Sequence, residues 1–132
     1  MRAVLDASAA ANIILRTKLA PALIEKLKRS RLVIAPALFH SEIANTLWKY
    51  VRFGDLDKET ALARYAEAIG LVDVFEADEQ LAAEALSTAI RYKHSVYDML
   101  YVILARRHGC SIVTVDKKLI TLTRQLDKIM LP

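Results

Sequence analysis

Short runs of consecutive apolar residues recur along this chain of 132 residues, and longer segments with helical periodicity separate them. The runs cover residues 2–5, 32–35, 71–75 and 111–115. A strand with one face exposed to solvent alternates polar and apolar residues, whereas a continuous apolar run is typical of a strand in a parallel sheet that is covered on both faces. The sequence therefore predicts a three-layer α/β/α sandwich. Its central, mainly parallel sheet is expected to have four to five strands, the fifth around residues 129–131.

Capping residues set the expected helix ends. Ser8, Asp57 and Ser95 belong to the types that accept N–H groups at helix N-termini, and Gly54 and Gly109 belong to the type that ends helices. The predicted helices cover residues 8–15, a segment from 21, 38–53, 57–69, 78–92, 96–108 and a segment from about 117. Because no repeat or linker interrupts this pattern, we expect one domain over residues 1–132.

The composition excludes several classes of protein. An apolar share of 55% is too high for a disordered chain, and no apolar run approaches the roughly 20 residues of a membrane span. Cys110 has no partner for a disulfide, and Asp6 comes too early for a secretory signal. We therefore expect a cytoplasmic protein with no membrane partner.

The net charge of +4 is unevenly distributed. Residues 1–54 carry nine Lys/Arg and three acids (+6), and residues 85–132 carry eight and three (+5). Residues 55–84 carry two Lys/Arg and nine acids (−7). Basic segments attract phosphates, which makes nucleic acid a reasonable partner, although solubility alone also explains such a charge. The acidic segment is expected to face away from a nucleic acid.

Four acids lie where an ordinary pattern gives them little reason to be. Asp6 and Asp116 follow apolar runs, so both belong at the carboxyl edge of the sheet, where α/β proteins bind ligands. Asp98 sits in a helix that is apolar almost all round, and Glu42 begins the helix after the second strand. Helix capping explains Asp6 and Asp116 equally well, a capping box with Ser95 is the alternative for Asp98, and the helix dipole is the alternative for Glu42.

Four carboxylates in one crevice would raise each other's pKa, and a divalent cation removes that conflict. Oxygen ligands without His or Cys favour Mg²⁺ or Mn²⁺ over zinc. Such an ion stabilises the charge that develops on a phosphate during hydrolysis, as in acidic nucleases.

In four segments the chain resembles the PIN-domain ribonucleases, especially VapC-type toxins. They are Val4–Ser8, Glu42–Trp48, Ser95–Tyr101 and Ile112–Leu119, in the family's order over nearly the whole chain. The resemblance implies a Mg²⁺- or Mn²⁺-dependent endoribonuclease with Asp6, Glu42, Asp98 and Asp116 as catalytic and metal-binding acids. It also implies an RNA substrate, a homodimer and a small VapB-like antitoxin.

The same resemblance assigns supporting roles. Ser8 and Thr114 would hold the metal-bound acids or water by hydrogen bonds, and Asn12 is either a further support or an amide facing the core. Expected RNA-binding residues are Arg16, Lys18, Lys117 and Lys118. Some relatives carry a further acid where this chain has the last two lysines, which leaves open whether one or two metal ions bind.

Rival interpretations differ in residues that can be checked. A non-catalytic PIN-like RNA- or protein-binding module would not need all four acids, and all four are present. A phosphate-accepting receiver domain wants paired acids after the first strand, where Ala7 follows Asp6. A haloacid-dehalogenase-like phosphatase wants an Asp at position 8, which is Ser8. Trp48, Tyr50 and Phe53 could stack on bases, but their helical spacing favours core or dimer packing.

Overall fold

The computed structural model describes the backbone of residues 1–130 and the side chains of residues 1–126. Its centre is one sheet of four parallel strands in the order β3-β2-β1-β4. The strands are β1 (Arg2–Leu5), β2 (Leu32–Pro36), β3 (Val74–Glu76) and β4 (Ser111–Val113). Since β1 is central and β2 and β4 flank it, the strand order reverses beside β1, and such a switch point is where α/β sheets open a crevice.

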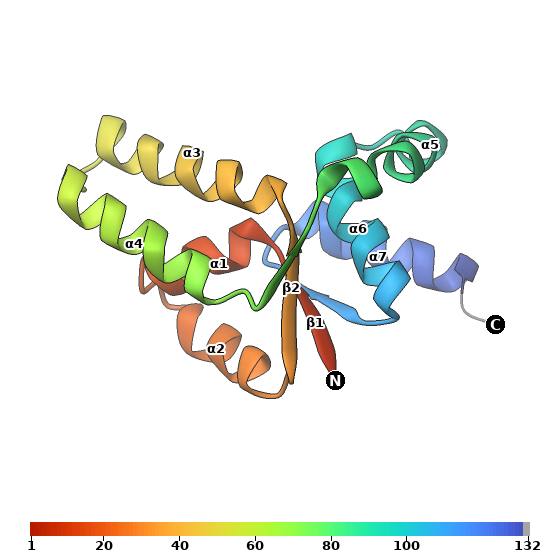
Figure 1. The fold of residues 1–132 in the computed structure, drawn as a ribbon, viewed down its shortest axis with the longest axis horizontal. Helices are drawn as coiled ribbons and strands as arrows, with labels where there is room; N and C mark the ends of the chain where they lie inside the picture. The colour runs from red at the N-terminus through yellow and green to blue at the C-terminus, as the bar shows by residue number, and fades with distance from the viewer. Residues whose placement is uncertain (131–132) are drawn as a thin grey trace.

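Helices cover both faces of the sheet, as Figure 1 shows. One layer holds α1 to α4, and the other holds α5 to α7. The bounds are α1 (Ala7–Ile14), α2 (Ala20–Lys28), α3 (Leu38–Phe53), α4 (Lys58–Gly70), α5 (Ala82–Tyr92), α6 (Val96–His108) and α7 (Lys117–Met130), with a short 3₁₀ turn at Asp78–Gln80. The predicted three-layer sandwich with a parallel sheet is confirmed.

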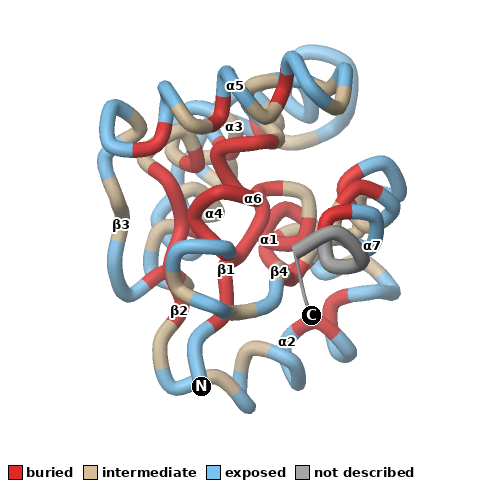
Figure 2. The backbone as a smooth tube through the Cα atoms, turned by 90° about the vertical axis from the view of Figure 1, so that its right-hand side faces the viewer, coloured by how far each residue is buried: buried red, intermediate tan, exposed pale blue. Residues whose placement is uncertain are grey.

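The core lies between β1, β2 and α6, where the backbone in Figure 2 is buried. Residues 3–5 of β1 are at most 2% exposed, and residues 99–105 of α6 are all buried. A helix that is apolar all round needs to be buried on every side. Helix α6 meets this need because it packs between the sheet and α5. This burial places Asp98, in the first turn of α6, at the edge of the core.

Several details of the expected fold are wrong. Strand β3 covers Val74–Glu76 where residues 71–75 were predicted, and the helix expected from Asp78 begins at Ala82, after the 3₁₀ turn. Helix α7 runs to Met130, so residues 129 and 130 are helical where a fifth strand was predicted, and residue 131 lies outside the described residues. Strand β4 ends at Val113, so Asp116 follows it by three residues in a loop. Helix α1 begins at Ala7 with Asp6 at its N-cap position, so Ser8 lies inside the first turn and does not cap.

Candidate active site

Asp6 is the buried anchor of the site. It follows β1 directly, its N–H donates to the carbonyl of Val113 (3.0 Å), and its side chain is only 6% exposed. The carboxylate does not cap α1, and its Oδ2 accepts hydrogen bonds from Ser8 Oγ (2.5 Å) and Thr114 Oγ1 (2.7 Å). Burial raises the pKa of Asp6, the two hydroxyl donors lower it, and the nearby Asp116 carboxylate raises it again. The capping explanation of Asp6 is therefore wrong.

The hydroxyls of Ser8 and Thr114 tie this carboxylate to the loop after β4. Thr114 Oγ1 accepts the N–H of Asp116 (3.0 Å), and Ser8 Oγ accepts the N–H of Val115 (3.3 Å). The two hydroxyl oxygens are 3.2 Å apart. Each side chain thus satisfies a backbone group of the loop while donating to Asp6, which fixes the loop that carries Asp116.

Glu42 faces the same region from the second turn of α3. Its Oε1 accepts a 2.6 Å hydrogen bond from the hydroxyl of Tyr101, a fully buried residue of α6. Burial raises the pKa of Glu42 to about 7, the Tyr101 hydroxyl lowers it, and the charges of Asp6, Asp98 and Asp78 raise it further. Glu42 therefore lies within electrostatic reach of two of the other predicted acids.

Asp98 lies beside His94, with 3.5 Å between Asp98 Oδ2 and His94 Nδ1. Burial raises the pKa of Asp98, His94 lowers it, and the charges of Asp116 and Asp6 raise it. Ser95 caps α6 by accepting the N–H of Tyr97 (3.1 Å), but its own N–H donates to His94 Nδ1 (3.0 Å). The reciprocal half of a capping box is missing, so that explanation of Asp98 is wrong.

Asp116 does cap a helix. Its Oδ1 accepts the N–H groups of Lys118 (2.8 Å) and Leu119 (3.3 Å) at the start of α7. The capping interpretation therefore holds for this acid, and the same carboxylate raises the pKa of both Asp6 and Asp98. Asp116 can cap α7 and still act with the other acids, because capping uses only its Oδ1.

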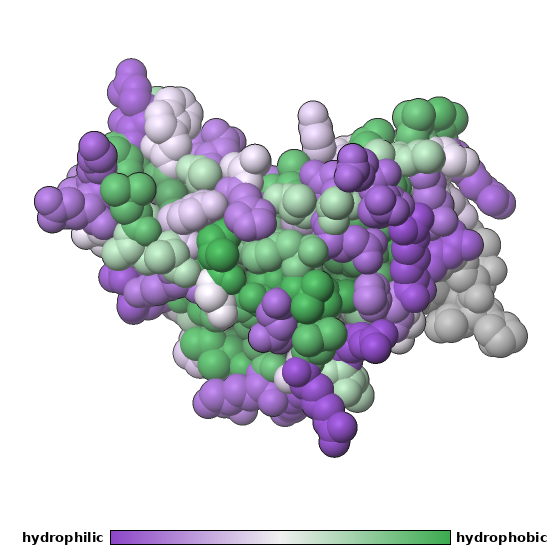
Figure 3. Space-filling view, in the orientation of Figure 1, coloured by the Kyte–Doolittle hydropathy of each residue, from purple (hydrophilic) through white to green (hydrophobic). Residues whose placement is uncertain are grey.

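The structure thus brings all four predicted acids to the carboxyl edge of the sheet. Asp116 raises the pKa of Asp6 and Asp98. Asp6 and Asp98 in turn raise the pKa of Glu42. In Figure 3 the surface dips at the top of the view, between the part of the molecule that holds α3 in Figure 1 and the part that holds α5. We use the name acidic cleft for the region of these four carboxylates, of which one is deeply buried and three are partly exposed.

The donor set fits a hard divalent cation. All the charged groups are carboxylates, and Mg²⁺ prefers oxygen ligands, uses one or two carboxylates and retains several waters. Within the described side chains no three His, Cys, Asp or Glu residues are close enough to hold one ion between them. These acids therefore suit an ion that keeps part of its water shell better than one held wholly by protein.

The other predicted residues are placed less uniformly. Asn12 donates to the Ser8 carbonyl (2.8 Å) and accepts from Thr17 Oγ1 (2.7 Å), so it braces α1 behind the site. Arg16 follows α1 with a left-handed backbone (φ 56°) and contacts Glu67 at 3.5 Å. Lys18 is exposed in the α1–α2 loop.

Lys117 and Lys118 begin α7 next to the site. The charge of Lys118 lowers the pKa of Asp98, so this lysine lies within reach of the acids. Lys117 lines a hollow together with His94. Of the four predicted RNA-binding residues, these two lie beside the cleft.

Sequence reasoning missed three residues of the site. Tyr101 and His94 contact Glu42 and Asp98, and Asp78 raises the pKa of Glu42 while accepting the N–H of Leu38 (3.0 Å). The buried hydroxyl of a tyrosine needs a partner, which was a signal for Tyr101. Because Asp78 belongs to residues 55–84, the expectation that this acidic segment faces away from the site is wrong at its C-terminal end.

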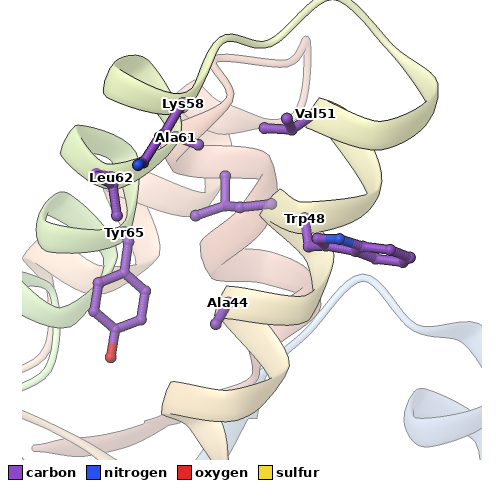
Figure 4. Close-up of a pocket in the computed structure, with 8 residues that line it drawn as sticks. Ala44, Trp48, Val51, Lys58, Ala61, Leu62 and Tyr65 are labelled. Atoms are coloured by element: carbon purple, nitrogen blue, oxygen red, sulfur yellow. The ribbon is translucent and has the colours of Figure 1, made fainter.

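A second hollow, between α3 and α4, is apolar. About 250 Å³ in volume, it is lined mainly by Ala44, Leu47, Trp48, Val51, Ala61 and Leu62, with Lys58 and Tyr65 at its edge (Figure 4). Core or dimer packing was expected for Trp48, Tyr50 and Phe53, and their exposures of 55%, 48% and 75% show that the core alternative is wrong. Packing in a dimer stays a prediction. This hollow offers no acid–base or metal chemistry.

Fold and site together define a class: an α/β/α domain with an acidic cleft at the carboxyl edge of a parallel sheet. The family model of the PIN domain matches residues 3–124, and the chain belongs to the PIN domain family. The resemblance to this family seen in the sequence is thereby confirmed.

Individual relatives agree with this assignment. Ribonuclease VapC3 of Pyrobaculum aerophilum is 32% identical over 83 residues, which cover 59% of this chain and 61% of that protein. The matched part thus spans about three-fifths of the relative's length. PAE2754 from the same organism has a similar fold (TM-score 0.74, 24% identity, covering 92% of this chain and 78% of that one). So does VapC20 of Mycobacterium tuberculosis, described as a Sarcin-Ricin loop cleaving toxin (TM-score 0.67, 17% identity, covering 91% and 94%).

Proposed function

We propose that this protein is a metal-dependent endoribonuclease that hydrolyses RNA phosphodiester bonds and acts as the toxin of a VapBC-type pair. The observation that carries the proposal is the buried Asp6 carboxylate, held by two hydroxyls and coupled to three further acids in one cleft. Similarity to Ribonuclease VapC3 supports the reaction and the substrate class. Strongly perturbed carboxylates in a cleft are typical of catalytic sites.

In this proposal Asp6, Asp98 and Asp116 would hold Mg²⁺ or Mn²⁺, partly through waters that the ion retains, and Glu42 would either join them or orient the attacking water. The ion supplies Lewis-acid stabilisation of the charge that develops on the phosphate. Ser8 and Thr114 keep the Asp6 carboxylate oriented, and Tyr101 keeps one oxygen of Glu42 engaged so that the other remains available. Asn12 supports Ser8 through its backbone carbonyl.

Substrate binding is assigned to the basic residues beside the cleft. Lys117 and Lys118 are next to the acids, whereas Arg16 and Lys18 would meet a longer strand that crosses the α1–α2 loop. Phosphate contacts by Lys and Arg fix the register of a nucleic acid and make its binding dependent on salt.

The proposed partners are a VapB-like antitoxin and a second copy of the chain, and the proposed compartment is the cytoplasm. Exposed apolar side chains on α3 and α4 support a protein partner, because contiguous apolar surface marks interaction sites. In the described part of the chain no helix is long and apolar enough to cross a membrane. Light scattering after size exclusion at micromolar concentration tests the dimer, and a monomeric mass would overturn it.

The reaction is tested by incubating the purified protein with a structured RNA in Mg²⁺ or Mn²⁺, with and without EDTA. We expect cleavage that EDTA abolishes and that Asp98→Asn lowers by at least about a hundredfold. Asp55→Asn makes the same change at an exposed residue and should cleave like wild type. If Asp98→Asn cut RNA as well as wild type, the assignment of the acids would be wrong. If wild type cut no RNA, the non-catalytic binding module would replace the nuclease.

A further inference from the structure

A third surface feature lies next to the acidic cleft. It is an open hollow of about 360 Å³ between the α5–α6 connection and the first turns of α7. Buried Leu122 contributes an apolar wall. Its remaining lining residues are polar, aromatic or basic: Tyr92, His94, Lys117, Lys118, Thr121 and Gln125.

The hollow adjoins the acids through two of its own lining residues. His94 Nδ1 is 3.5 Å from Asp98 Oδ2, and the N–H of Lys118 donates to Asp116 Oδ1. The charge of Lys118 also reaches Asp98, whose pKa it lowers. A group bound in the hollow would therefore lie one residue away from the carboxylates of Asp98 and Asp116.

The charge of the hollow is opposite to that of the cleft. Two lysines line it, and no acid does among the residues that the structure describes. Asp116 accepts the N–H groups of Lys118 and Leu119 in the first turn of α7, so an anion here would be bound mainly by side chains. A flexible ammonium group is well suited to contact a phosphate oxygen.

The rest of the lining suits a base more than a second phosphate. The Tyr92 ring and Leu122 provide apolar surface, and aromatic rings contribute to binding unpaired bases by stacking. Gln125 and Thr121 carry donors and acceptors that can pair with a base edge. His94 Nδ1 faces the Ser95 N–H, which leaves the other ring nitrogen, Nε2, as a further group for hydrogen bonding. The volume is within the range of small-molecule sites.

We propose that this hollow binds one unpaired nucleotide of the RNA strand, adjacent to the bond that is cut, and that it contributes to sequence preference. Lys117 and Lys118 contact its phosphate, while Tyr92, Thr121 and Gln125 contact its base. The inference rests on the proposed function, because the strand must continue from the acidic cleft into the hollow. It adds to that function a place where the enzyme distinguishes one base from another.

The test measures binding, so that it does not depend on catalysis. The parent protein is the Glu42→Gln variant in EDTA, and the probes are fluorescently labelled RNA hexamers of A, C, G or U. Removing both lysines (Lys117→Ala with Lys118→Ala) should weaken the binding of all four probes. It should also reduce the steepness of log affinity against log salt by about 1.4, because each lysine that neutralises a phosphate of a single strand accounts for about 0.7. The matched control, Lys26→Ala with Lys28→Ala, removes two exposed lysines at the C-terminal end of α2 and should leave both values unchanged.

Base contacts are tested separately by Gln125→Ala and Thr121→Val. We expect the preferred hexamer to lose about fivefold in affinity relative to the others, the value of one hydrogen bond, with an unchanged salt slope. Circular dichroism establishes that each variant is folded. If the base variants left the relative affinities of the four hexamers unchanged, the nucleotide site would be overturned even if the lysine variant weakened binding.

Parallel cleavage by wild type separates this inference from the proposed function. If wild type cuts RNA and every variant in the hollow binds like the parent, the hollow is excluded and the nuclease stands. If wild type neither cuts nor binds any RNA, both are overturned.

Discussion

Replacing Glu42 by Gln should stabilise the protein when no metal is present. Burial of the Glu42 carboxyl, and after it the charges of neighbouring acids, raise its pKa from 4.5 to about 7 on folding. The substituted amide keeps an oxygen that can accept the Tyr101 hydroxyl, and it buries no charge beside Asp6 and Asp98. The variant therefore removes the cost of burying a charge and the repulsion, and it preserves the main hydrogen bond.

The magnitude follows from the shift in pKa. One pKa unit corresponds to about 1.4 kcal/mol, so keeping Glu42 ionised in the folded state costs at most about 3.4 kcal/mol. Solvent screens a partly exposed side chain, which reduces the expected gain in the variant to about 1–2 kcal/mol. For a domain of this size that gain raises Tm by about 4–8 °C.

The sign of the pH dependence is fixed by the direction of the shift. Because the folded pKa lies above the unfolded one, the cost of ionisation is fully present above pH 7 and disappears as the pH falls below 4.5. In EDTA at pH 8, thermal and urea unfolding should therefore show Glu42→Gln to be more stable than wild type, and the difference should fade by pH 4. The exposed Glu79→Gln is the matched control and should show no such trend.

Two results would refute this reasoning: a variant no more stable than wild type at pH 8, or an advantage that does not change with pH. Added Mn²⁺ extends the test to the proposed metal site. An ion that binds the folded state stabilises it by mass action, so wild type should gain more stability from Mn²⁺ than the variant does. Equal gains would exclude Glu42 from the metal site.

Further predictions concern single contacts. Tyr101→Phe removes the donor to Glu42 but keeps the buried ring, and it should lower unfolding free energy by about 1–2 kcal/mol and weaken Mn²⁺ binding severalfold in calorimetry. Asp57→Ala removes the cap of α4 and should cost about 1 kcal/mol in urea unfolding. Gly109→Ala meets no atom within 4 Å but places a side chain at φ +58°, so a thermal melt should show a loss of about 1 kcal/mol from backbone strain alone. Trp48→Ser should change the free energy of urea unfolding by less than about 0.5 kcal/mol, because the ring is exposed. A larger loss would show that Trp48 contributes to the core.

The strands were predictable because burial on both faces leaves a simple mark in the sequence. Residues 3–5 and 32–35 are apolar without interruption, and both lie in strands of the observed sheet. The ends of the elements were less predictable, since they depend on where backbone hydrogen bonds stop. The mainly apolar residues 112–115 continue past the last ladder pair of β4 at Val113, and the backbone of residues 129–130 continues helix α7 although their composition also suits a strand.

The four acids were found because two of them follow apolar runs, Asp98 lies in an apolar helix, and all four segments occur in the order of a known family. The contacts that hold these acids leave no such mark in the sequence. Tyr101 in an apolar helix is an ordinary core residue until its hydroxyl is seen to meet Glu42, 59 positions away. Asp78 appeared to be one acid among nine in a solvated segment. Only the 3₁₀ turn before α5, which brings Asp78 against the start of α3, places it near Glu42.

The burial of Asp6 lowers the stability of the folded chain. A carboxylate at 6% exposure is costly to ionise, and an apolar residue beside β1 would suit the core better. The chain instead provides Asp6 with two hydroxyl donors, which favour its charged form, while Asp116 opposes that form from the next loop. Donors that stabilise the charge of Asp6 and a neighbouring acid that repels it are what the proposed metal site would require, because a bound cation would offset the repulsion. Ser8→Ala with Thr114→Ala should therefore lower Mn²⁺ affinity in calorimetry more than it lowers the free energy of unfolding in EDTA. A large loss of stability with unchanged Mn²⁺ affinity would instead make the two hydroxyls structural supports of the loop.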